Sequence, residues 1–147
     1  MELKDLYRDV ILDHNRQPRN FGQLAEATAQ AEGHNPLCGD RLSLYLRMNG
    51  DRLEDLRFEG HGCAISTASA SLMTEAVKGK DRAAVGQLFD QVHSLLTRAD
   101  ALPGPQLGKL AALSGVREFP MRVKCATLCW HTLNAALAHK AATVSTE

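Results

Sequence analysis

The chain lacks an excess of either charge, a rich set of aromatic residues and any long apolar run. Its 147 residues include 17 basic and 17 acidic side chains, so the usual electrostatic basis for binding nucleic acid or an anionic membrane is missing. Aromatic residues make up 5% of the chain, too few for a base-stacking platform. No apolar stretch approaches the roughly 20 residues of a membrane span, and the first residues lack the basic start and apolar core of a signal peptide. We therefore expect a cytoplasmic protein with no nucleic-acid or membrane partner.

The chain has four cysteines, and no two of them form a CxxC pair. In the reducing cytoplasm such cysteines bind metals or react more often than they form disulfides. Cys38, Cys63 and Cys125 each stand beside glycine, proline or a predicted helix start, and Asp40 closely follows the first of them. Three thiolates and one carboxylate make a four-ligand tetrahedral set for a borderline-soft metal such as zinc. The other interpretation is that these cysteines are buried small hydrophobes.

Residues around the cysteines add to the hypothesis of a metal site. Cys63 and Cys125 each precede a predicted helix, and the partial positive charge of a helix N-terminus favours thiolate over thiol. Arg122 and Lys124 alternate before the last of these cysteines, so they either stabilise a thiolate or persulfide from one face or form a solvated pair. Cys129 lies four residues further on, on the same helix face, and is either a second thiol near the site or a core residue.

Histidines offer further candidates for chemistry. His34 and His61 lie near cysteines in the sequence and are candidate ligands or proton carriers. His14 sits at the end of a predicted helix, where it could act as a cap. Three others fall within predicted helices, where we expect surface or boundary residues: His93, His131 and His139.

Hydrophobic periodicity indicates one domain of helices around a hairpin. Alternating apolar residues predict strands over 42–48 and 52–59, joined by a type I′ turn at Asn49-Gly50, with a bulge in the second strand. A weak extended stretch covers about 24–32, and we expect a frayed tail over 141–147. Apolar spacing predicts helices over about 3–11, 64–78, 81–98, 107–113 and 125–139. The predicted fold class is α+β, with helices packed on one face of a small antiparallel sheet of about three strands.

Five motifs resemble those of the U-type iron–sulfur cluster assembly proteins, the IscU/NifU-N family, and most closely its SufU branch. The resemblance runs from about residue 6 to residue 138, and the motifs are DHNRQPRNFG (13–22), NPLCGD (35–40), FEGHGCAIS (58–66), ASASLMT (68–74) and RVKCATL (122–128). It implies a single domain of that fold over 1–147 and a role in iron–sulfur cluster biogenesis. It also implies that the metal ligands are Cys38, Asp40, Cys63 and Cys125.

Two departures from the IscU type distinguish the branches. That type has a histidine just before the last ligand cysteine and a Leu-Pro-Pro-Val-Lys chaperone-docking motif, whereas this chain has Lys124 and the segment 119–123, Phe-Pro-Met-Arg-Val. The SufU type has an insertion, which the stretch 83–113 resembles. The resemblance therefore implies a zinc-dependent sulfurtransferase that accepts persulfide sulfur on Cys38 from a SufS-type cysteine desulfurase. It further implies an important basic residue at Arg122 and downstream cluster-assembly proteins as further partners.

In the implied mechanism, zinc holds the resting site, a desulfurase histidine replaces Cys38 on the metal, and the freed thiolate takes up the sulfur. One alternative is a scaffold that binds iron or builds and transfers a [2Fe–2S] cluster. Another is a purely structural zinc protein, against which Asp40 argues because closed structural sites use cysteine and histidine. The branch has serine where this chain has Cys129. The sequence leaves open the bound metal, the downstream acceptor, the oligomeric state and the role of this extra cysteine.

Overall fold

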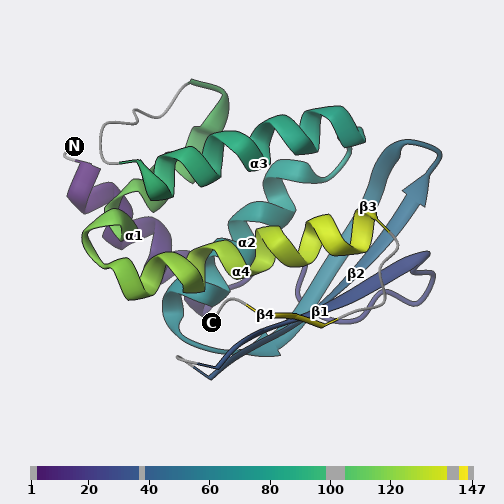
Figure 1. Ribbon diagram of the computed structural model, residues 1–147, viewed down its shortest axis with the longest axis horizontal. Helices are drawn as coiled ribbons and strands as arrows, with labels where there is room; N and C mark the ends of the chain where they lie inside the picture. Colours follow the sequence, from purple (N-terminus) through teal and green to yellow (C-terminus); the bar gives the residue numbers. More distant parts are fainter. Residues whose placement is uncertain (1–2, 37–38, 99–104, 139–142, 146–147) are drawn as a thin grey trace.

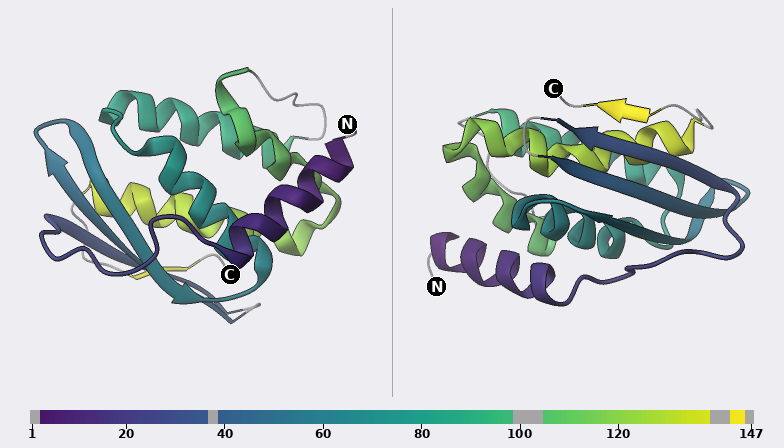
Figure 2. Two further views of the ribbon diagram at one scale, coloured as in Figure 1. Left: turned by 180° about the vertical axis from the view of Figure 1, so that it is seen from behind. Right: turned by 90° about the horizontal axis from the view of Figure 1, so that it is seen from below.

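A computed structural model describes residues 3–36, 39–98, 105–138 and 143–145 (Figure 1). The elements in chain order are α1 (Leu3–Arg16), β1 (Ala29–Asn35), β2 (Asp40–Asn49), β3 (Arg52–His61), α2 (Ala64–Val77), α3 (Arg82–Thr97), the 3₁₀ segment η1 (Pro105–Glu118), α4 (Pro120–Leu137) and β4 (Thr143–Ser145). The sheet has the strand order β3-β2-β1-β4, in which β4 pairs parallel to β1 and the other neighbours are antiparallel. The helices gather on one face of this sheet (Figure 2), which confirms the predicted α+β class.

The core lies between the sheet and the helices that cover it. Along β2, every second residue from Leu42 to Leu46 is buried. On β3, Leu56 and Phe58 follow the same spacing, and Leu53 is buried on the other side of a register shift. This alternation is what a half-buried antiparallel sheet requires, because successive side chains point to opposite faces. α4 packs over β1 and beside α2, and it buries Trp130 in this core. None of the helices in the described ranges is long and apolar enough to cross a membrane.

The hairpin of β2 and β3 forms where it is predicted, but its turn differs. Asn49 pairs with Arg52, so the two loop residues are Gly50 and Asp51. Only Gly50 has a positive φ, of 63°, whereas a type I′ turn needs positive φ at both positions. The predicted type I′ turn is therefore wrong, and the single positive φ at the first position is that of a type II′ turn. The predicted bulge is confirmed by a register shift next to Arg47.

The connection after α1 is held by hydroxyl groups of α2. α1 continues to Arg16, past the predicted end before residue 13, and buries His14 completely. The Nδ1 atom of that histidine lies 2.7 Å from the hydroxyl of Ser71, which also accepts the backbone N–H of Arg19 at 2.8 Å. Thr74 accepts a further hydrogen bond from the next residue, Asn20, at 3.0 Å. Two hydroxyl groups of α2 thus hold this connection in place.

Three boundaries at the C-terminal half differ from the predictions. η1 runs over Pro105–Glu118 as 3₁₀ structure interrupted at Gly108, rather than as a short helix over 107–113. α4 begins at Pro120, five residues before its predicted start, and proline suits the first turn of a helix, where its missing N–H has no partner to lose. Within the expected frayed tail, Thr143–Ser145 instead form β4, which pairs with the free edge of β1.

Candidate metal centre

Three of the four predicted ligands converge at one end of the sheet. One ligand atom each of Asp40, Cys63 and Cys125 lies within 4.8 Å of the other two. They come from the start of β2, the N-cap of α2 and the second turn of α4. Zinc bonds of about 2.0–2.3 Å place tetrahedral ligand atoms roughly 3.3–3.8 Å apart. The three donor atoms therefore need to move only slightly closer together to bind one metal ion. Cys38 lies outside the described residues, so its predicted place in the set stays a prediction.

Asp40 is completely buried, and its carboxylate is oriented by the backbone. Its Oδ1 atom accepts the N–H of Cys63 at 2.8 Å, and its Oδ2 atom lies 4.0 Å from the sulfur of the same residue. A Cβ atom at Gly62 would collide with that Oδ1 atom, so any other residue there would force the carboxylate to move. A buried carboxylate is costly unless it is hydrogen-bonded or coordinated, and this one faces two cysteine sulfurs.

Cys63 occupies the N-cap of α2, as predicted. It has an extended backbone (φ −71°, ψ 167°), and its sulfur accepts the N–H of Ser66 at 3.4 Å. The half-buried sulfur therefore lies at the helix end that carries free N–H groups and the positive end of the dipole. A thiolate is the form that binds metal ions.

Cys125 does not precede its helix, contrary to the prediction, because α4 has already made more than one turn before it. Its fully buried sulfur instead accepts a hydrogen bond from the side-chain amide of Asn35 at 3.5 Å. Asn35 is also fully buried, and it pairs with Asp40 across the β1–β2 ladder. The structure thus adds Asn35 to the site, a residue that stood in the sequence analysis only as part of a motif.

Arg122 lies one helical turn before Cys125 and faces the cysteines. The negative charge of a Cys63 thiolate, together with side-chain hydrogen bonding to both cysteines, raises the pKa of Arg122 above its ordinary value. The predicted common face of Arg122 and Lys124 is wrong, because two residues apart on a helix point in different directions whereas residues three apart are neighbours. Of the two basic residues, the arginine is therefore the one that belongs to the site.

Cys129 is a core residue rather than a second reactive thiol. It is 2% exposed, its sulfur lies 3.5 Å from the hydroxyl of Ser69, and burial raises the pKa of its thiol to about 12. That hydroxyl also donates to the carbonyl oxygen of Ala126 at 2.6 Å, so α2 and α4 pack closely here. Among the described residues no histidine joins the ligand group, so His34 and His61 are not its members.

The rim of the site carries exposed apolar side chains. Phe119 and Met121 are 50% and 64% exposed at the start of α4, directly before Arg122. Exposed large apolar groups beside a polar site are typical of surfaces that contact another macromolecule. The start of α4 therefore presents two exposed apolar side chains and the exposed Arg122 next to one another.

Comparisons with known proteins cover nearly the whole chain. A family model described as NifU-like N terminal domain matches residues 6–126. Over 139 residues the chain is 44% identical to the zinc-dependent sulfurtransferase SufU of Bacillus subtilis, covering 92% of each protein. It is 39% identical over 140 residues to the iron–sulfur cluster assembly scaffold protein IscU of Streptococcus pyogenes, covering 95% of this chain and 87% of that one.

Solved structures share the fold. A candidate iron–sulfur cluster assembly scaffold protein for the SUF system from Fervidobacterium islandicum superposes with a TM-score of 0.82 at 34% identity, over 90% of this chain and 97% of that one. The N-terminal part of a NifU-like protein from Brucella abortus gives a TM-score of 0.84 at 25% identity, over 94% and 96%. The chain therefore belongs to the NifU-like N-terminal domain family, the family that its motifs resemble.

Proposed function

We propose that this protein is a zinc-dependent sulfur acceptor in iron–sulfur cluster biogenesis, which takes persulfide sulfur from a SufS-type cysteine desulfurase onto Cys38. The observation that carries the proposal is the convergence of Asp40, Cys63 and Cys125 beneath the guanidinium of Arg122. The relative named as a zinc-dependent sulfurtransferase, at 44% identity, supports it. Downstream cluster-assembly proteins are the proposed recipients of the sulfur.

The three converging residues and Cys38 are the side chains that would hold the ion. Covalent geometry keeps a residue two positions from Asp40 within about 7 Å of it, so a fourth donor at position 38 is within reach. When bound, zinc supplies a redox-inert Lewis acid that keeps its cysteine ligands in the thiolate form. The buried carboxylate and the N-cap thiolate provide donors of the types that zinc accepts.

The proposed transfer is a thiolate–persulfide exchange. The Cys38 thiolate attacks the outer sulfur of the desulfurase persulfide, an S–S bond forms at Cys38, and the S–S bond on the desulfurase breaks. The desulfurase cysteine leaves as a thiolate, so the negative charge moves from the attacking Cys38 thiolate to that leaving group, and no external oxidant or reductant is required. Arg122, which already faces two cysteine sulfurs, stabilises the negative charge that gathers at the site.

The second candidate function is a scaffold for a [2Fe–2S] cluster, which relatives named IscU favour. Against it stands Lys124, an exposed lysine on α4 at the position where the scaffold type has histidine. We further propose that 83–113, which contains most of α3, is the insertion of the SufU branch. Elemental analysis of untagged protein purified anaerobically separates the candidates: about one zinc per chain without iron or sulfide supports the acceptor, and iron with sulfide supports the scaffold.

A transfer assay tests the chemistry itself. The protein is incubated with a SufS-type desulfurase and cysteine, and mass spectrometry locates the chain segment that gains one sulfur. We expect the gain on the peptide with Cys38 and its loss in Cys38→Ser, while Cys129→Ser behaves like the parent. A Cys38→Ser variant that keeps its zinc and fold and still stimulates the desulfurase would contradict the proposal and favour a structural zinc site.

A further inference from the structure

A pocket of about 330 Å³ opens between α2, α3 and η1, away from the cysteine site. Its lining residues are Leu72, Glu75, Ala76, Lys80, Leu88, Leu107, Lys109 and Leu110. At 1.5 Å per residue along α2, the lining residues Leu72 and Glu75 lie roughly 14–18 Å from the N-cap cysteine. The volume is at the lower end of the roughly 300–1,000 Å³ typical of small-molecule sites. We propose that this pocket binds a small amphipathic carboxylate, an anion with an apolar tail.

The floor of the pocket is made by core side chains. Leu72, Leu88, Leu107 and Leu110 are each between 2% and 7% exposed, so the pocket reaches down to the core that joins the three elements. Ala76 is half-buried and leaves room between the leucines. An apolar tail placed here would leave water without burying any polar side chain of the leucine floor, which favours binding.

The rim of the pocket carries an excess of positive charge. Lys80 and Lys109 line it, and within the described part of the chain neither ammonium group has an ion pair or a hydrogen bond. Glu75 is the acidic residue of the lining, and its Oε1 atom already lies 3.5 Å from the Nε2 atom of His14. The two lysines outnumber the one carboxylate of the lining, which favours an anionic head group.

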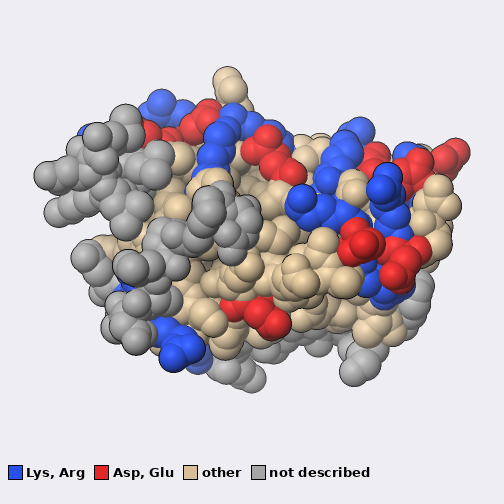
Figure 3. All heavy atoms as spheres, turned by 90° about the horizontal axis from the view of Figure 1, so that it is seen from above, with Lys and Arg blue, Asp and Glu red and all other residues tan. Residues whose placement is uncertain are grey.

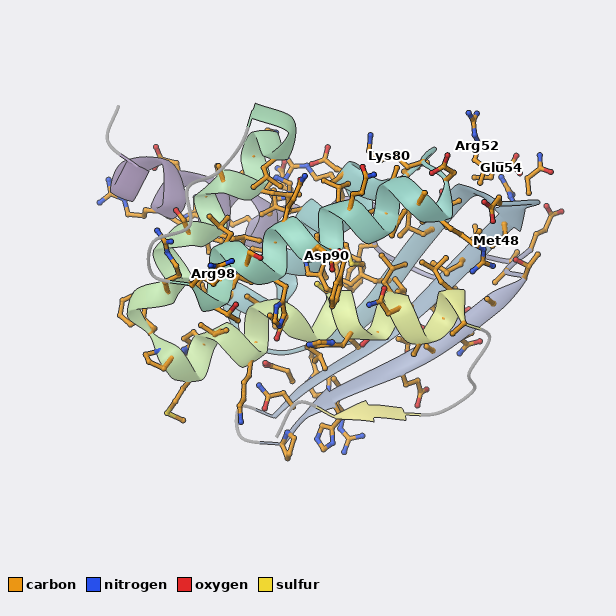
Figure 4. The ribbon with its side chains drawn as sticks, turned by 45° about the horizontal axis from the view of Figure 1, so that its top comes forward. Met48, Arg52, Glu54, Lys80, Asp90 and Arg98 are labelled. Carbon is orange, nitrogen blue, oxygen red and sulfur yellow. The ribbon has the colours of Figure 1, made fainter. Side chains whose placement is uncertain are left out.

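The backbone fixes the position of one of these lysines. The carbonyl oxygen of Lys80 accepts the N–H of Leu53 at 2.8 Å, and its own N–H donates to the carbonyl oxygen of Val77. Figure 4 shows this lysine at the edge of the helical layer, where α2 gives way to α3. On the face seen from above, surface formed by uncharged and histidine residues lies between basic and acidic side chains (Figure 3).

The pocket depends on the stretch that we propose as the insertion of the SufU branch. Leu88, Leu107, Lys109 and Leu110 all lie within 83–113, and α2 provides the opposite wall. A chain without this stretch would lose one lysine and most of the floor. The inference itself rests on the pocket and its charges, and it is independent of the proposed sulfur transfer.

The test is a titration of the zinc-loaded, ¹⁵N-labelled protein with decanoate below its micellar concentration. We expect amide shifts confined to the pocket residues, with a sub-millimolar dissociation constant. Decyltrimethylammonium, which has the same tail and the opposite charge, should bind at least tenfold more weakly. Ala76→Phe, which fills the space between the leucines, should abolish the shifts, while Ala83→Phe on the exposed side of α3 should not.

A charge-reversal pair completes the test. Lys80→Glu/Lys109→Glu should weaken decanoate binding at least tenfold, whereas Arg52→Glu/Arg57→Glu, with the same change in net charge on exposed β3 positions, should leave it unchanged. Shifts that map to another surface, equal binding of the anionic and cationic probes, or an unchanged affinity in the lysine variant would each overturn the proposal. Because zinc content and desulfurase stimulation are measured separately, a failure here does not bear on the sulfur acceptor.

Discussion

The side-chain amide of Asn35 donates a hydrogen bond to the sulfur of Cys125, 90 residues later in the chain, at 3.5 Å. Both side chains are fully buried, and Asn35 also pairs with Asp40 in the β1–β2 ladder. One asparagine thus connects two of the proposed metal ligands. Residues that hydrogen-bond to a metal ligand orient it, and their mutation commonly lowers the affinity for the metal.

Asn35→Asp tests this role, because it keeps the shape of the side chain and replaces the amide donor by a negative acceptor. We expect zinc affinity to fall by about 10–100-fold, the usual range for residues that support a ligand. The measurement is competition with a chromophoric chelator, together with the thiolate absorption of the cobalt-substituted protein. Asn134→Asp, at an exposed position of α4, is the matched control. An unchanged affinity in a folded Asn35→Asp protein would contradict the role.

Gly62→Ala should disturb the site through a single methyl group. The new Cβ atom would collide with Oδ1 of Asp40, so the carboxylate must turn away from Cys63 and from the metal. We expect a loss of at least tenfold in zinc affinity. Gly86→Ala is the control: it has open space on α3 and should stabilise the protein by about 0.5–1 kcal/mol. Tight zinc binding by Gly62→Ala would show that Asp40 is not a ligand.

Arg122→Gln should separate sulfur transfer from zinc binding. The guanidinium faces the cysteine sulfurs but is not a metal ligand, so zinc content should stay near one per chain while the transfer rate falls about tenfold or more. Arg122→Lys should recover only part of the rate, because lysine lacks the planar fork of donors. Lys124→Gln, on a different side of α4, should transfer sulfur normally. Equal rates for Arg122→Gln and the parent would remove this residue from the chemistry.

Acid should destabilise the fold through His14. Burial lowers the pKa of this histidine, with Arg19 and Lys109 acting in the same direction and Glu75 and Asp13 against it. The folded state therefore keeps His14 neutral while the unfolded chain takes up a proton near pH 6.5, so stability is present above that pH and is lost below it. Uptake of one proton lowers the free energy of unfolding by at most about 1.4 kcal/mol per pH unit.

The measurement is chemical unfolding of the protein between pH 7.5 and 5, in the presence and absence of zinc. His14→Gln should flatten the loss of unfolding free energy on acidification, whereas the exposed His93→Gln should not. A parent-like slope in His14→Gln would assign the acid sensitivity to other groups.

Local sequence patterns account for the parts of the fold and of the site that could be predicted. The hairpin follows from alternating leucines, and the N-cap role of Cys63 follows from the small residues before a helical stripe. The start of α4 could not be found in this way, because its first turn projects exposed side chains such as Met121 and shows no apolar stripe. The contact of Asn35 with Cys125 arises only when β1 and α4 pack together, so a linear pattern gives no sign of it. β4 is hidden for the same reason, since it pairs with a strand more than 100 residues earlier.

The three converging donors sit on β2, α2 and α4, so a bound ion would tie the sheet to two helices at one point. Because the unfolded chain does not bring these donors together, the free energy of ion binding would add to the stability of the folded domain. Exchange of one ligand during sulfur transfer would then leave the other ties in place. The centre that handles the sulfur would therefore also keep the sheet and the two helices joined while one of its ligands has left the ion.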